Sequence, residues 1–280
     1  MLVSYNAVPR RHTYTENLCT AHNGGIKSHS QGGFFMGHLM RITLLGLVSG
    51  LTGTGLGGLS AFLVSRTSNR IMSTILEFSA GLMTAVVCFE LLPEAFNLGG
   101  TFYTFVGIVS GILAVVLIEN MLKRSQALAG GENSGLLKAG ILMAIAIALH
   151  NLPEGFAVGS GFEASASLGF TITAAIIIHD IPEGIAMAVP MRAGGLSRFK
   201  AFGYTLLSGV PMGLGALLGA VLGMISDNLT AACLGFAGGA MLYIIYGELV
   251  PESKRLYLGR LSSFANVCGI LCGIIVSIYN

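Results

Sequence analysis

Residues 166–191 read ASLGFTITAAIIIHDIPEGIAMAVPM, an apolar run with His179, Asp180 and Glu183 near its centre. A helix that crosses a bilayer needs about 20 mostly apolar residues, so this run is long enough to span one. It is too long for an ordinary strand, and its apolar residues do not alternate with polar ones. The run therefore predicts a transmembrane helix that holds ionisable side chains inside the membrane.

Further apolar runs of this kind cover most of the chain. Their approximate ranges are 39–65, 72–95, 101–122, 136–160, 202–225, 230–250 and 261–279. Of the 280 residues, 53% are hydrophobic and only 10% are charged. Because a soluble domain carries about 25% charged residues, this composition excludes an ordinary cytosolic enzyme. We expect an all-α integral membrane protein with eight transmembrane helices over residues 39–280.

Residues 1–38 differ from the rest, since they are polar and rich in Ser, Thr, Asn, Gly and His. We expect a disordered N-terminal segment there. No basic region followed by an apolar core precedes residue 39, so the segment does not resemble a secretory signal. Met36 or Met40 is an alternative start of the chain. The five cysteines form no C-x-x-C pair, which argues against a zinc ribbon or a thioredoxin motif.

Lys and Arg are concentrated in alternate loops between the expected spans. They are Arg66 and Arg70 in loop 1–2, Lys123, Arg124 and Lys138 in loop 3–4, Arg192, Arg198 and Lys200 in loop 5–6, and Lys254, Arg255 and Arg260 in loop 7–8. The positive-inside rule places these loops in the cytoplasm, so both termini are expected outside a cell (inner) membrane. No basic block indicates a nucleic-acid partner.

The sequence repeats itself at an offset of 158 residues. Phe78–Glu94 and Phe236–Glu252 share Phe, Gly and Met positions and end in E-L-L-P-E and E-L-V-P-E. The spans that carry them are an odd number apart, so they cross the membrane in opposite directions. Spans 4 and 5 carry H-N-L-P-E-G and H-D-I-P-E-G. This pattern predicts a 3+2+3 inverted repeat, an arrangement typical of transporters with the site at the repeat interface.

The motifs in spans 4 and 5 gather potential metal ligands. His150 with Glu154, and His179 with Glu183, are four residues apart and share a helix face. Asn151 and Asp180 follow the two histidines. No Lys or Arg lies between residues 139 and 191, so a divalent cation would supply the missing positive charge. Imidazole with carboxylate suits zinc and its first-row neighbours. A proton-bridged polar cluster that only joins helices is the alternative.

Three other residues are weaker candidates. Glu90 and Glu248 occupy equivalent positions of the repeat and could line a route to the metal site, although carboxylates at helix ends in the headgroup region are an equal alternative. Met83 is a potential soft ligand, but a lone methionine is usually a packing residue.

With these motifs and eight spans, the chain over approximately residues 39–280 resembles the ZIP family of divalent metal transporters, especially its bacterial branch. The resemblance implies a primary site of His150, Glu154, His179 and Glu183. It also implies a second site in which Asn151 and Asp180 share the two glutamates. Met83 matches a position that can complete the primary site. Many relatives place a Glu just before a Pro in span 6, where this chain has Val210. A homodimer is implied by the resemblance alone.

We therefore expect a transporter that carries divalent transition-metal ions into the cytoplasm. Zinc is the favoured ion, and Fe²⁺, Mn²⁺, Co²⁺ and Cd²⁺ are the others considered, since the metal is cargo and no prosthetic group is expected. The sequence contains no G-x-x-x-x-G-K-[ST] motif for ATP. An intramembrane metal-dependent hydrolase is the alternative function, although the sequence lacks H-E-x-x-H.

Overall fold

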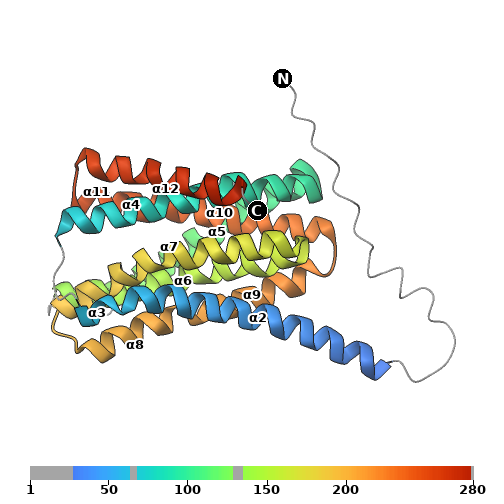
Figure 1. The fold of residues 1–280 in the computed structure, drawn as a ribbon, viewed down its shortest axis with the longest axis horizontal. Coiled ribbons are helices and arrows are strands. Elements are labelled where there is room, and N and C mark those ends of the chain that lie inside the picture. The colour runs from blue at the N-terminus through green and yellow to red at the C-terminus, as the bar shows by residue number, and fades with distance from the viewer. Residues whose placement is uncertain (1–27, 64–67, 129–134, 279–280) are drawn as a thin grey trace. The chain divides into compact units, whose positions relative to one another are not determined.

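The computed structural model describes residues 28–63, 68–128 and 135–278, which form helices and no strand (Figure 1). The chain divides into two compact units, Met1–His38 and Leu39–Asn280. Helix α2 (Ser28–Gly58) begins ahead of the span expected from residue 39. Residues 1–27 of the expected polar segment lie outside the described residues.

The described part of each apolar range expected from the sequence falls on a helix or on consecutive helices, apart from short turns. The elements after α2 are α3 (Ser60–Leu63), α4 (Asn69–Val86), the π-helical turn η1 (Val87–Leu91), α5 (Leu92–Leu128), α6 (Gly135–Ala164), α7 (Ala166–Ala193), α8 (Arg198–Ser208), α9 (Val210–Gly223), α10 (Asp227–Ile244), the π-helical turn η2 (Ile245–Leu249), α11 (Val250–Leu256) and α12 (Arg260–Ile278).

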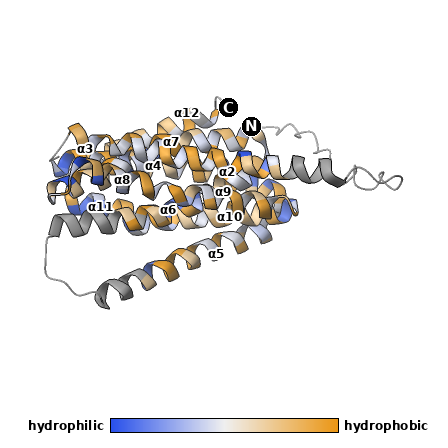
Figure 2. Ribbon diagram, turned by 90° about the horizontal axis from the view of Figure 1, so that it is seen from below, coloured by the Kyte–Doolittle hydropathy of each residue, from blue (hydrophilic) through white to orange (hydrophobic). Residues whose placement is uncertain are grey.

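Several of these segments are long and apolar enough to cross a membrane. Within the described ranges there are five: Met36–Leu63, Asn69–Met121, Ala166–Ala193, Arg198–Gly223 and Asp227–Leu256. Figure 2 shows hydrophobic residues along the helices, with hydrophilic ones near helix ends. Large apolar side chains such as Phe102, Leu117 and Phe264 are exposed, which suits contact with lipid. The described residues are helical almost throughout, and the chain is a multi-pass membrane protein.

The repeat seen in the sequence extends to the helix boundaries. Helices α4 and α10 begin and end 158 residues apart, and so do η1 and η2. Both helices start at a serine N-cap. Ser68 Oγ accepts a hydrogen bond from the backbone N–H of Ile71 at 3.3 Å, and Ser226 Oγ accepts one from Leu229 at 3.2 Å. The two copies thus share start signals as well as apolar pattern.

A π-helical turn precedes a proline in each copy. The backbone N–H of Leu92 and of Val250 bonds to the carbonyl five residues back, and Pro93 and Pro251 follow. Proline cannot donate a hydrogen bond and crowds the carbonyl four residues before it, so a wider turn relieves both problems. After Pro93, α5 is broken at Gly100, whose φ of 64° is readily adopted only by glycine.

The helices approach one another closely through glycines. Helix α4 packs on α12, α5 on α10, α6 on both α7 and α9, and α2 on α7. In Figure 1, α4 and α12 run side by side. At Gly81, Gly107, Gly155 and Gly184 an added Cβ would come closer than 3.0 Å to the partner backbone. Small residues at helix interfaces bring backbones together, which is how helices associate in lipid.

Polar side chains join α4 to α11 and α12. The hydroxyl oxygens of Ser73 and Ser253 are 2.8 Å apart. Lys254 Nζ pairs with Glu77 Oε1 at 2.8 Å, and Asn266 Nδ2 donates to Glu77 Oε2 at 2.9 Å. Because Glu77 is only 2% exposed, these partners neutralise a carboxylate that would otherwise be costly to bury.

Candidate metal site

Helices α6 and α7 carry both repeated motifs and pack against each other. Between them, Ser165 caps α7, and its Oγ accepts a hydrogen bond from the backbone N–H of Leu168 at 3.1 Å. Both helices continue through their internal prolines, Pro153 and Pro182. Each proline lacks the backbone N–H that a helix would use and crowds the carbonyl four residues before it.

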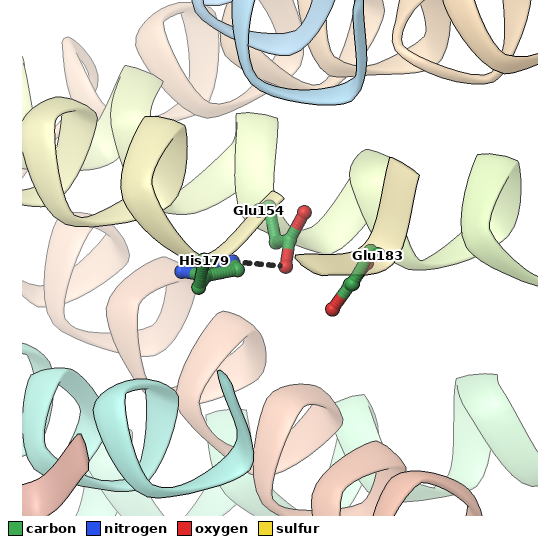
Figure 3. A group of neighbouring side chains, drawn as sticks. All are labelled: Glu154, His179 and Glu183. Carbon is green, nitrogen blue, oxygen red and sulfur yellow. Dashed lines mark hydrogen bonds and ion pairs between the residues drawn. The ribbon is translucent and has the colours of Figure 1, made fainter. Parts of the chain in front are cut away.

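Three of the expected ligands form a close, buried group. Glu154 of α6 meets His179 and Glu183 of α7, and one potential ligand atom from each lies within 4.8 Å of the other two (Figure 3). His179 Nε2 is 2.9 Å from Glu154 Oε1. His179 and Glu183 are one helical turn apart, so both reach the same side of α7. This group has the size and the donor atoms of a site for a single small cation.

Polar atoms without hydrogen-bond partners concentrate at this group. Glu154 Oε2, both carboxylate oxygens of Asp180 and both of Glu183 are buried and accept no hydrogen bond. Asp180 Oδ1 lies 3.5 Å from His179 Nε2. Among the ion pairs of the described residues, none joins a Lys or Arg to these carboxylates. A divalent cation would satisfy the oxygens and offset their charge, and imidazole with carboxylate suits zinc.

His150, the fourth expected primary ligand, has a different partner. Its Nε2 lies 2.9 Å from Glu248 Oε2, which comes from η2. His150 and Glu248 also line a cavity of about 150 Å³, together with Glu119 and apolar residues. Tyr243 donates its hydroxyl proton to Glu119 Oε2 at 2.9 Å. The structure thus places His150 beside the expected pathway residue Glu248, and neither belongs to the close group of ligands.

The two residues expected in a second site differ in their surroundings. Asn151 Nδ2 donates to the carbonyl of Ser208 at 2.7 Å, which leaves its buried Oδ1 without a hydrogen-bond partner. Asp180 is fully buried and neither oxygen accepts a hydrogen bond. Val210, at the position where the family resemblance implies a glutamate, begins α9 and is 37% exposed. The residue from this region that reaches Asn151 is therefore Ser208.

Helix α4 and the turn η1 carry the remaining candidate residues. Met83 is fully buried in the apolar core, as is Met241 at the equivalent position of the repeat. Glu90 is half-buried in η1 and does not belong to the close group of ligands. The sequence did not single out Ser79, whose hydroxyl donates to the carbonyl of His179 at 3.1 Å. A small polar residue in an apolar helix gives no signal of such a long-range contact.

The chain is similar to known proteins of one family. Residues 125–279 match the family described as ZIP Zinc transporter. The chain is 33% identical to the zinc transporter ZupT of Streptococcus mutans, over 84% of this chain and 95% of that protein. It is 32% identical to ZupT of Akkermansia muciniphila (86% and 98% covered) and 34% identical to the zinc transporter GufA of Myxococcus xanthus (75% and 89%). These comparisons give no support to the alternative of a hydrolase.

Proposed function

Because the chain belongs to the ZIP zinc transporter family, we propose that it carries divalent transition-metal ions, zinc foremost, into the cytoplasm through the site between α6 and α7. One observation carries this proposal: the buried group of Glu154, His179 and Glu183, with carboxylate oxygens that have no protein partner. The relatives are named zinc transporters. Fe²⁺, Mn²⁺, Co²⁺ and Cd²⁺ remain candidate cargo, because affinity order alone does not set selectivity.

In the proposed topology, eight spans form a 3+2+3 inverted repeat with both termini outside the cell membrane. The equal boundaries of α4 and α10 support the repeat, and the positions of Lys and Arg support the orientation. The homodimer implied by the family resemblance belongs to the same proposal. The metal is cargo, and we assign the chain neither a prosthetic group nor an enzymatic reaction.

The proposed primary ligands are Glu154, His179 and Glu183, with His150 and Met83 able to complete the set when the ion arrives. Asn151 and Asp180 would hold any second ion beside the shared glutamates. An arriving hydrated ion exchanges its water for imidazole nitrogen and carboxylate oxygen. The ion pair of His150 with Glu248 supports a route that leaves the group through the neighbouring cavity. Glu90, at the equivalent position of the repeat, would serve the route on the other side.

Reconstitution into liposomes tests the function. Purified protein should admit zinc to vesicles that contain a metal-sensitive dye, and empty vesicles should show no signal. Zinc influx supports transport. Hydrolysis of a membrane peptide without any influx would instead establish the hydrolase alternative and refute the proposed function.

Zinc affinity should fall as the solution becomes more acidic. Imidazole has a reference pKa of about 6.5, and His and carboxylate ligands must be free of protons to bind metal, so protons compete with zinc below about pH 6. Equilibrium binding in detergent separates this effect from any proton gradient across a membrane. An affinity that stays constant between about pH 5 and 7.5 would contradict imidazole ligation.

We expect one tightly bound ion per protomer and a markedly weaker second ion. A second ion would depend on Asn151, Asp180 and the shared glutamates, because Val210 supplies no carboxylate. Two dications at such short range repel strongly, and few carboxylates are present to screen them. Titration calorimetry with zinc measures both affinities. Two ions of equal affinity would show that another acid, such as Glu248, completes the second position.

A further inference from the structure

Gly53 of α2 lies directly against a candidate metal ligand. A Cβ added at this glycine would come closer than 3.0 Å to Asp180 Cβ, and it would lie 3.0 Å from Asp180 Oδ2 and 3.1 Å from the carbonyl of Ile177. At the other close helix contacts of the described residues, glycines face backbone, apolar side chains or residues outside the site. Here the missing side chain leaves room for a carboxylate.

Asp180 is held by packing rather than by hydrogen bonds. Both of its oxygens are buried and accept none, whereas the equivalent Asn151 is fixed by its bond to the Ser208 carbonyl. Among the described residues, Asp180 forms an ion pair with His179, whose Nε2 is 3.5 Å from Asp180 Oδ1. The α2 backbone at Gly53 therefore forms the wall that limits where this carboxylate can lie.

We propose that Gly53 is a positioning residue for metal transport, which keeps the Asp180 carboxylate beside the group of Glu154, His179 and Glu183. The inference rests on the proposed function of that group. Rotation of the aspartate side chain cannot relieve a clash at Asp180 Cβ, because Cβ is fixed to the backbone. One helical turn further along α2, a Cβ added at Gly57 would also come closer than 3.0 Å to the α7 backbone at Ile181 and Gly184. A side chain at position 53 must therefore shift α2 or the α7 turn that carries the ligands.

Gly53→Ala tests this inference, and Gly46→Ala is its matched control. Gly46 lies on the same helix, and its added Cβ would also come closer than 3.0 Å to a Cβ, that of Ala216 in α9, away from the ligands. We expect Gly53→Ala to raise the KM for zinc uptake and the Kd for zinc by about 10- to 100-fold, as loss of a ligand's supporting contact does. Gly46→Ala should leave both unchanged. An unchanged Kd in Gly53→Ala, or equal changes in both variants, would overturn the proposal.

A double variant identifies the contact responsible. Asp180→Gly removes the Cβ that Ala at position 53 would strike, so Gly53→Ala should add no further loss of zinc affinity in that background. A further loss as large as in the wild type would show that Gly53 acts elsewhere. If Gly53→Ala fails to accumulate in membranes but the double variant accumulates, the clash with Asp180 is established. If neither accumulates, Gly53 serves helix packing alone and the proposal is wrong.

Equilibrium zinc binding by purified protein separates this inference from the proposed function. Wild-type protein that binds zinc but gives no influx would refute transport, while the Kd values of the two glycine variants would still test Gly53. Normal influx with an unchanged Gly53→Ala variant would refute the positioning role alone.

Discussion

Glu154→Gln is expected to lower zinc uptake by more than about 100-fold while the protein still inserts into the membrane, since loss of a contact that only supports a ligand already costs about 10- to 100-fold. Glu154 is the one carboxylate that α6 gives to the close group of ligands. Its Oε1 is 2.9 Å from His179 and its Oε2 has no hydrogen-bond partner. Glutamine keeps the size of the side chain but removes the negative charge that attracts the ion.

Uptake into liposomes, normalised to the amount of reconstituted protein, measures the effect. Glu252→Gln is the control, because Glu252 lies on α11 in a partly exposed pair with Arg255 at 3.5 Å, and such pairs contribute little. The control should transport like the wild type. Glu154→Gln protein that still transports at limiting zinc would remove Glu154 from the ligand set.

His179→Ala should reduce uptake at limiting zinc by at least about tenfold, and by more than His150→Ala does. The two histidines occupy equivalent motif positions, but only His179 belongs to the close group of ligands, whereas His150 pairs with Glu248. Removing His179 deletes a donor from the binding site itself. Removing His150 affects the ion pair beside the cavity.

Zinc uptake over a range of concentrations distinguishes the two variants. We expect His179→Ala to raise KM, with membrane levels similar to those of the wild type. Equal losses in the two variants would mean that both histidines bind the ion in the same state. A larger loss in His150→Ala would reverse the assignment of the primary ligand.

Much of the helical layout follows from local sequence. The serine caps at Ser68 and Ser226 and the apolar runs after them are local signals, and the structure has helices of the same length at both places. The E-L-L-P-E and E-L-V-P-E motifs indicated only a repeat, and the π-helical turns ahead of Pro93 and Pro251 were not predicted. The span expected from residue 39 lies within α2, which begins at Ser28.

The site was less accessible to sequence reasoning. Spacing of four residues shows that His150 and Glu154 share a helix face, but it cannot show which neighbouring helix that face meets. The ring of His150 reaches Glu248, almost 100 residues further along the chain. The contacts of Ser79 with His179 and of Gly53 with Asp180 are also long-range. These contacts depend on how the helices pack. A serine or a glycine in an apolar run does not indicate such a contact.

The polar contacts between α4 and α11 bear on the history of the two halves. The positions equivalent to Ser73, Glu77 and Ser253 hold Ala231, Gly235 and Ala95. If the halves descend from a duplicated gene, one copy gained or lost Glu77, its partner Lys254 and the two serines beside them. Losing Lys254 alone would leave the buried Glu77 carboxylate without its positive partner. Such a loss would destabilise the protein unless Glu77 also changed. The two halves therefore differ at this contact, where one buries a paired carboxylate and the other has small residues at the equivalent positions.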